Sequence, residues 1–274
     1  MDNLSANVGK RQTFRFRSWN VIVNKSHILP SRCLKAPHCV SDNESVDTRK
    51  CDFCKFEKEL ELPQVPEMTF ANNVLRLEHD NGFAIEFNAL DALKMVDSKN
   101  DSLKVAVAEA WAESRMESPH LKGVIKPFDW TYGTNYKGTL QNSDKIQVEP
   151  TEERIDIEKL KVKSEILFYE DVILFEDELA DNGIAQFTVK IRVMPDSFFV
   201  LMRYFLRVDN LIIRIIDTRI YYEEGTNHLL REHMTKESKI KDLKVPIGLL
   251  GNPQELWSHM PIKQFEYEKL KIVS

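Results

Sequence analysis

The spacing of apolar side chains predicts β-strands in the N-terminal part of the chain. Between residues 13 and 29, apolar residues alternate with arginine, asparagine and other polar residues, a period of two that is typical of one strand or a pair of strands. Two shorter alternating runs follow at 74–77 and 83–87, separated by His-Asp-Asn-Gly at 79–82. Because Asn-Gly favours the tight turns that join antiparallel strands, these runs predict a β-hairpin.

Helices are expected beside these strands. Asn88 stands where an N-cap would be, and Leu90 and Leu93 follow at helical spacing. A second helical pattern covers 103–111, where apolar residues recur with helical periodicity. The segment 127–139 is aromatic yet rich in turn-forming residues, which predicts an ordered, packed loop.

Strand patterns dominate the C-terminal half. Residues 166–175 are expected to form a strand, and 187–193 alternate apolar residues with lysine and arginine, as in an antiparallel sheet with one solvent-facing side. The run 197–206 is too evenly apolar to distinguish a short capped helix from a buried strand. A turn at 209–210 then leads into a further strand-like segment at 211–222.

These elements predict an α+β fold with an antiparallel β-sheet or sandwich core, flanking helices and a single domain. With 274 residues and 42% hydrophobic content the chain can bury a large core, and no Pro/Gly/Ser-rich stretch is long enough to link separate domains. The domain is expected over 13–265, between a flexible N-terminus at 1–12 and a C-terminal tail at 266–274. Within it, the polar stretch 31–58 is expected to be a cysteine-containing insertion without an apolar core of its own.

The charge pattern argues against nucleic acids and membranes as partners. The chain has 38 basic and 43 acidic residues, a net charge of -5 and a pI near 5.9, so it has no global attraction for a phosphate backbone. Residues 1–17 lack the apolar segment of a secretory signal, and no apolar run approaches the roughly 20 residues that span a bilayer. We therefore expect a cytoplasmic or nuclear protein.

The sequence contains none of the common catalytic motifs. It has no phosphate-binding loop, nucleophile elbow, His-Glu-x-x-His motif or dinucleotide-binding glycine pattern, and its seven histidines are scattered. Acidic clusters at 152–153 and 176–178 offer paired carboxylates, but runs of like charge beside a strand are more often solvated edges. We therefore expect no catalytic residues and a protein that is not an enzyme.

The four cysteines of the chain lie close together in the sequence, as Cys33, Cys39, Cys51 and Cys54. The Cys-x2-Cys spacing of the last pair lets two thiolates reach one tetrahedral ion, and a structural zinc would order a polar segment that lacks a core. The alternative is that these residues are ordinary thiols of a variable loop, since the first spacing is loose and no flanking hairpin is evident. The sequence leaves both interpretations open.

Several longer segments, taken in order, resemble one known family. They are Leu-Pro-x-x-Pro-Glu-Met at 62–68, Asn-Asn-Val-Leu-Arg-Leu at 72–77, Gly-Phe-x-Ile-Glu-Phe-Asn-Ala at 82–89, Ile-Lys-Pro-Phe-Asp-Trp-Thr-Tyr at 125–132, Leu-Phe-Glu-Asp-Glu-Leu at 174–179, Val-Lys-Ile-Arg-Val-Met-Pro at 189–195 and Asp-Thr-Arg at 217–219. Together they resemble the TIPRL family, the TOR-signalling-pathway regulator-like proteins. The match runs from about Phe14 to Lys263 and is weakest in the cysteine segment.

The resemblance implies an α+β protein, built on antiparallel sheet, that binds and inhibits the catalytic subunits of type 2A, 4 and 6 protein phosphatases. It also implies contact with the alpha-four/Tap regulator of these phosphatases and a role in TOR signalling. Neither a chemical reaction nor a required cofactor is attributed to the family.

By similarity, Asp91, Ile155, Ile215 and Asp217 are expected to contact the phosphatase. Ile215 and Asp217 lie two positions apart, so on a strand both point to one face. The alternative for the two aspartates is a structural role, as a helix N-terminal residue or as the partner of Arg219, and the alternative for the two isoleucines is plain core.

These residues lead to the hypothesis that the protein captures an extended phosphatase segment, its C-terminal tail, against the sheet. Apolar pockets would give affinity, and Asp91 or Asp217 would accept hydrogen bonds. Two alternatives stay open. One is a scaffold that meets phosphatases only through the alpha-four/Tap regulator, and the other is a zinc-stabilised module in which residues 33–54 make the contact.

Overall fold

Two antiparallel β-sheets form the framework of the computed structural model, which describes residues 9–33, 39, 51–60, 62, 64–96, 131–179 and 181–273. The small sheet has the order β1-β2-β4-β5-β6, with bounds Lys10–Phe16, Trp19–Lys25, Val74–His79, Ala84–Asn88 and Thr139–Gln141. The large sheet has the order β3-β8-β9-β10-β11-β12-β13-β7, with bounds Met68–Thr69, Phe168–Asp177, Gly183–Val193, Ser197–Val208, Ile212–Glu223, His228–Lys239, Ile262–Ile272 and Ile146–Pro150.

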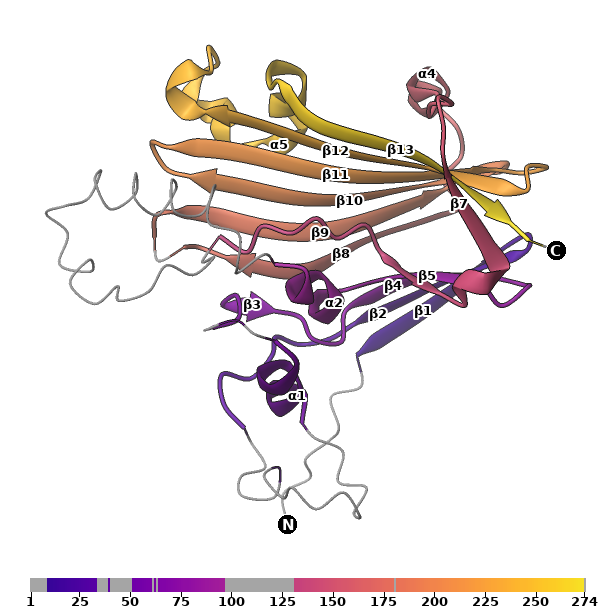
Figure 1. Cartoon of the computed structure of the whole chain (residues 1–274), viewed down its shortest axis with the longest axis horizontal. Helices are drawn as coiled ribbons and strands as arrows, with labels where there is room; N and C mark the ends of the chain where they lie inside the picture. Colours follow the sequence, from indigo (N-terminus) through magenta and orange to yellow (C-terminus); the bar gives the residue numbers. More distant parts are fainter. Residues whose placement is uncertain are drawn as a thin grey trace, which may run out of the picture.

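Short helices flank the sheets. The α-helices are α1 (Asp52–Glu59), α2 (Ala89–Lys94), α4 (Ile157–Lys161) and α5 (Pro253–Leu256), and the 3-10 helices are η2 (Ser143–Lys145), η3 (Ile240–Asp242), η4 (Ile247–Gly251) and η5 (Trp257–His259). Figure 1 shows the small sheet below the large one, with α5 above one end of the large sheet and α4 above the other. The predicted class, an α+β protein with an antiparallel sandwich core, is confirmed.

The two sheets pack face to face around one apolar core, and we call the side of the large sheet that takes part its inner face. Trp19 of the small sheet is fully buried and meets Phe198 of the large sheet at a ring-centroid distance of 5.5 Å. Deeper in the large sheet, Phe187 packs against Phe175 and Tyr204. Aromatic rings that fill the space between the layers remove a large apolar area from water, which is the main stabilising term of such a fold.

The evenly apolar run at 197–206 is part of a strand, β10, so the helix alternative for this segment is wrong. Its even-numbered residues from Phe198 to Val208 are buried against the small sheet. Its odd-numbered residues point to the opposite side, which we call the outer face, and there Phe205 is buried as well. Apolar residues on both faces hide the alternation by which a strand is normally recognised.

The chain crosses between the sheets at 69–74, and Asn73 ties them together there. Its side-chain oxygen accepts a hydrogen bond from the amide of Ser26, next to β2, and its Nδ2 donates to the carbonyl of Ile173 in β8 at 2.7 Å. Asn73 is buried, so both bonds are shielded from water, and leaving either amide group unpaired would be unfavourable.

Several expected elements are found with modified limits. The strand pair within 13–29 and the hairpin at 74–87 are present as β1–β2 and β4–β5, and the Asn88 side chain caps α2 as expected. The insertion expected at 31–58 contains a helix, α1, whose Phe56 is buried in the main core. Residues 266–272 lie in β13 instead of in a tail, because that strand pairs with both β12 and β7.

Two sequence predictions fall wholly or partly outside the described residues. The helix expected at 103–111 lies outside them, and so does the first part of the loop expected at 127–139. In the described part of that loop, Tyr132 and Tyr136 are buried. Among the helices that the structure describes, none is long and apolar enough to cross a membrane.

Candidate functional site

The outer face of the large sheet carries three of the four residues predicted to contact a partner. In β11, side chains alternate between the two faces, so Ile215 and Asp217 both lie on the outer face. Ile155 precedes α4 and packs on Tyr221 of the same strand. The structure therefore brings these three onto one surface, along the length of β11.

One end of the outer face is apolar and covered by the C-terminal helical segment. Ile215 is fully buried there, in a cluster with Phe205, Ile213, Leu256 and Met260. Phe205 and Ile213 come from the adjacent strands β10 and β11. Leu256 and Met260 come from the segment that contains α5 and η5. Ile215 thus fixes the position of this covering segment.

The opposite end has a smaller apolar cluster, formed by Ile155, Tyr221 and Leu230. The amide of Ile155 donates to Glu232 Oε1 at 3.0 Å, and Arg154 Nε donates to the same oxygen at 2.8 Å. Glu232 is almost completely buried, so these bonds compensate a carboxylate that would otherwise be costly to remove from water. They hold the segment before α4 on the sheet.

Between these ends lies a set of charges around one indole, which we call the arginine–tryptophan cluster: Arg203, Asp217, Arg219, Lys236 and Trp257. The guanidinium of Arg203 binds the Asp217 carboxylate through two parallel hydrogen bonds of 2.7 Å each. Arg219 donates to the same carboxylate at 3.2 Å. Such forked pairing is the strongest ordinary contact between these groups, and it satisfies an aspartate side chain that is fully buried.

The three cations of this cluster lie over the indole rings of Trp257. The Arg219 guanidinium lies 4.6 Å from the centroid of its indole rings, the Lys236 ammonium 4.5 Å, and Arg203 5.6 Å. Lys236 also donates to the carbonyl of Trp257 at 2.6 Å. Cations are attracted to the electron-rich face of an aromatic ring, so the indole orients all three side chains.

The cluster carries more positive than negative charge, because three cations share the single carboxylate of Asp217. Burial lowers the pKa of Lys236, neighbouring Arg219 lowers it further, and Asp217 partly opposes this. The side chains of Arg203 and Arg219 are 11% and 17% exposed, so a partner can reach them. The arrangement suits an added acceptor, such as a carboxylate or a backbone carbonyl of a bound segment.

Asp91 lies apart from these three residues. It is in the first turn of α2, where its amide donates to Asn88 Oδ1 at 2.8 Å and its Oδ2 accepts from Thr139 Oγ1 at 2.6 Å and from Asn88 Nδ2 at 3.0 Å. All these partners belong to the small sheet or border it. The structure does not join Asp91 to the arginine–tryptophan cluster.

Sequence reasoning missed Arg203, Lys236 and Trp257. Arg203 interrupts an apolar run in β10, and Asp217 interrupts another in β11. A buried charge is costly unless it is paired, so the opposite charges of Arg203 and Asp217 in successive, largely apolar strands were a usable signal. Trp257 gave no such signal, because its contact with the sheet depends on how the C-terminal segment folds back.

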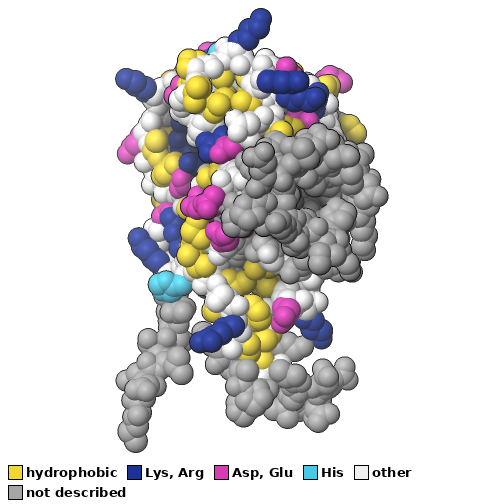
Figure 2. All heavy atoms as spheres, turned by 90° about the vertical axis from the view of Figure 1, so that its left-hand side faces the viewer, with side chains coloured by type: hydrophobic (Ala, Val, Ile, Leu, Met, Phe, Trp, Pro, Cys, Tyr) yellow, Lys and Arg dark blue, Asp and Glu magenta, His cyan; other side chains and the backbone are white. Residues whose placement is uncertain are grey.

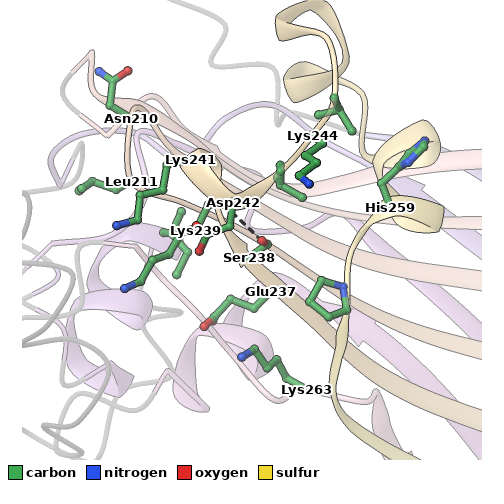
Figure 3. A pocket seen from close by; sticks show the side chains of 14 residues that line it. Asn210, Leu211, Glu237, Ser238, Lys239, Lys241, Asp242, Lys244, His259 and Lys263 are labelled. Carbon is green, nitrogen blue, oxygen red and sulfur yellow. Dashed lines mark hydrogen bonds between the residues drawn. The ribbon is translucent and has the colours of Figure 1, made fainter.

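A pocket of about 930 Å³ adjoins the apolar end of the outer face. It is lined by the β10–β11 turn, the end of β12 and the segment around η3, and it shares Leu243 and Val245 with the apolar packing at Ile215. Figure 3 shows Lys239 and Lys241 on one side of this hollow and Lys244 and His259 on the other. Four lysines and two acidic residues line it, and one of the acids, Glu237, is paired with Arg214 at 2.6 Å. The lining is therefore positive on balance.

Apolar side chains are exposed beside this pocket. Figure 2 looks at this end of the molecule and shows apolar atoms gathered at its top, with lysine and arginine side chains around them. Ile247 in η4 is 86% exposed, the largest such value among the apolar residues that the structure describes as exposed. Apolar surface bordered by basic groups is typical of a protein-binding site.

The four cysteines form a separate cluster beside α1. Their Sγ atoms all lie within 4.8 Å of one another, and each residue is half-buried. Burial raises the pKa of Cys51, but hydrogen bonds from the Cys54 amide and from the other thiols outweigh this and lower it to about 7. The residue types and spacing are those of a site for a soft metal ion.

Comparison of the sequence with known proteins shows the family of this chain. The model of the TIP41-like family matches residues 68–244. A TIP41-like protein of Homo sapiens is 48% identical over 259 residues, which cover 94% of this chain and 88% of the relative. The type 2A phosphatase activator TIP41 of Saccharomyces cerevisiae is 39% identical over 213 residues, covering 72% of this chain and 60% of the relative. The chain therefore belongs to the TIP41-like family.

Proposed function

We propose that this protein regulates type 2A-class serine/threonine phosphatases by binding their catalytic subunit through the outer face of the large sheet. The observation that carries the proposal is the arginine–tryptophan cluster, an incompletely neutralised group of charges between two apolar clusters. Membership of the TIP41-like family supports the phosphatase as partner, because two yeast relatives are named type 2A phosphatase activators. A regulator of this kind needs a docking surface and no catalytic residues.

In this proposal, arginines rather than aspartate meet the partner on the outer face. The Asp217 carboxylate is fully buried and already accepts hydrogen bonds from Arg203 and Arg219, so it has little capacity for a donor of the partner. Its role is to hold the two guanidiniums in place. Their remaining N–H groups would donate to carbonyl or carboxylate oxygens of an extended segment, such as the C-terminal tail of the catalytic subunit.

The two predicted isoleucines act through the segments that they hold. Ile155 and Ile215 are only 4% and 0% exposed, so neither side chain offers area to a partner in this conformation. Ile215 instead supports the segment that carries Trp257, and Ile155 anchors the segment before α4. Asp91 remains a candidate for a second contact, because both hydrogen bonds that its carboxylate accepts within the described residues end on Oδ2, leaving Oδ1 for a donor.

We further propose that the effect on the phosphatase is inhibitory, that type 4 and 6 catalytic subunits bind in the same way, and that the protein works in TOR signalling in the cytoplasm or nucleus. These points rest on the resemblance of the sequence to the TIPRL family. The two yeast relatives are named phosphatase activators, so inhibition or activation by this protein has to be measured. Turnover of a phosphopeptide by the catalytic subunit, with increasing amounts of this protein, gives it directly.

The decisive experiment measures binary binding of the purified protein to a purified type 2A catalytic subunit by biolayer interferometry. Arg219→Gln removes a cation of the cluster and should raise Kd on the order of tenfold, because a hydrogen bond to a charged group is lost. Arg15→Gln is the matched control, since Arg15 forms an exposed pair with Asp80 on the small sheet and should leave Kd unchanged.

Three results would count against the proposal. If no binary complex forms, and binding appears only after the alpha-four/Tap regulator is added, the protein acts as an indirect scaffold. Equal effects of the two arginine variants would move the docking surface away from the outer face. Loss of binding in Arg219→Gln accompanied by a large fall in melting temperature would mean that Arg219 is needed for folding rather than for contact.

A further inference from the structure

The four cysteine sulfurs lie close enough together to bind one metal ion. Zinc binds thiolates at about 2.3 Å, so two sulfurs on one tetrahedral ion lie about 3.8 Å apart. The Sγ atoms of Cys33 and Cys51 are 3.7 Å apart, and all four sulfurs lie within 4.8 Å of one another. The bond of a disulfide is only about 2.0 Å long, so this pair is not oxidised.

The backbone around α1 is organised to present thiolates. Cys51 is the N-cap residue of α1 and Cys54 lies in its first turn, so both sulfurs point to the start of the helix. Amide donors stabilise negative sulfur, and amide groups at the start of a helix do so most effectively.

The donor set and its size select the type of metal. All four ligand atoms are sulfur, which disfavours calcium and magnesium because these ions prefer oxygen. An iron–sulfur cluster would need its cysteines spread around several iron and sulfide atoms, whereas these sulfurs are close enough to share a single ion. A mononuclear tetrahedral site remains, and zinc is its usual occupant in structural sites.

We propose that Cys33, Cys39, Cys51 and Cys54 bind one structural zinc ion that joins the segment after β2 to α1. On binding, each thiol that is still protonated releases its proton to solvent as its sulfur–zinc bond forms, so metal binding is linked to pH. This site lies on the far side of the small sheet from the outer face of the large sheet (Figure 1).

The zinc would give α1 a further attachment to the described body of the protein. In α1, only Phe56 is buried. Asp52 accepts a hydrogen bond from Asn72 at 2.7 Å, and Glu59 pairs with Lys94 of α2 at 2.5 Å. Through that ion pair, a metal-fixed α1 supports the helix that carries Asp91.

The test uses the full chain, purified under reducing conditions without chelator, and metal analysis by mass spectrometry. We expect about one zinc per chain, and its loss in the double variant Cys51→Ser/Cys54→Ser. Lys55→Ser is the matched control, because it places a serine beside Cys54 at an exposed position that supplies no ligand, and it should retain the metal.

Two further measurements identify the site. Cobalt added to the metal-free protein should give the intense thiolate charge-transfer and visible bands of a tetrahedral sulfur site, and the double variant should show neither. Removal of zinc by a chelator should speed proteolysis between positions 33 and 51 while the sandwich core stays resistant.

The proposal is overturned if the reduced protein neither contains zinc nor takes up cobalt, if iron occupies the site, or if intact mass under non-reducing conditions shows that disulfides link these cysteines. Retention of zinc by the double variant would place any bound metal elsewhere. Phosphatase binding gives a separate readout: it should persist in the double variant, and its failure there would implicate the cysteine segment without altering the metal result.

Discussion

The two faces of the large sheet use the same strands for different purposes. On the inner face, β10 presents an unbroken series of buried residues to the small sheet. On the outer face, the same strand presents Arg203, held by Asp217 of β11, between two small apolar clusters. The inner face thus gains from the removal of apolar area from water, while the outer face keeps charges whose mutual pairing is incomplete.

This difference separates stability from recognition. Inner-face side chains interlock with a second layer of the same molecule, and close packing makes each of them sensitive to a change of volume. The outer face has no second sheet in the described part of the chain, and its central charges stay within reach of another molecule. A partner would meet cations that are fixed in direction before binding, which reduces the entropy lost on association.

The largest effect is expected from truncating the inner face. Phe187→Ala removes a ring packed against Phe175, Tyr204 and Tyr136, and should lower the free energy of unfolding by about 4 kcal/mol, because a cavity remains. Phe265→Ala is the control, since Phe265 is 60% exposed and should change stability by less than about 1 kcal/mol. Urea unfolding measures both, and similar losses would contradict the distinction between the faces.

A smaller but substantial loss is expected on the outer face. Asp217→Asn weakens the pairing of Arg203 and Arg219 in a buried position and should lower the free energy of unfolding by about 3 kcal/mol. Asp80→Asn makes the same change in an exposed ion pair, where about 0.5 kcal/mol is expected. If chemical denaturation gave the two variants equal stability, the cluster would not be a fixed structural unit.

The smallest effect concerns a polar exception on the inner face. Burial lowers the pKa of His233 to about 4, with Lys137 and Arg231 acting in the same direction and Glu266 against it. The unfolded chain therefore binds a proton below about pH 6.5 that the folded chain takes up only near pH 4, so stability is complete above pH 6.5 and falls as the pH drops.

Between pH 7 and pH 5, the protonation of His233 in the unfolded chain should lower the free energy of unfolding by about 2 kcal/mol. His233→Gln removes the titration, so its stability difference between the two pH values should be smaller than that of the natural chain by this amount. Urea midpoints measured at both pH values provide the comparison. An unchanged difference in the variant would show that other groups carry the acid sensitivity.

The parts of the fold predicted from sequence are those set by local chemistry. The Asn-Gly turn and alternating runs predicted the β4–β5 hairpin, and Asn88 was recognised as the cap of α2. The length of β10 was not predictable, because apolar residues occupy both of its faces. Strand β13 was missed for a different reason. Much of it is exposed and charged, and it is fixed by pairing with the preceding strand β12 and with β7, which lies far away in the sequence.

The candidate site could be predicted only in part. The spacing of two residues between Ile215 and Asp217 predicted that both lie on one face of a strand, and the structure agrees. The bond between Asp217 and Arg203 depends on the register of β10 against β11, and the position of Trp257 depends on the fold of the C-terminal segment. Such long-range geometry leaves no local pattern in the sequence, and whether these residues contact a phosphatase stays a prediction.

The borders of the large sheet limit how another chain can attach to it. In the described part of the molecule these borders are β3, of 2 residues, and β7, of 5 residues, whereas the interior strands reach 12. These short edge strands offer too few free backbone groups for a peptide to pair with as an additional strand. The same shortage discourages edge-to-edge self-association. Attachment would therefore have to proceed over the broad side of the sheet, where selectivity resides in side-chain chemistry and can change without rebuilding the scaffold.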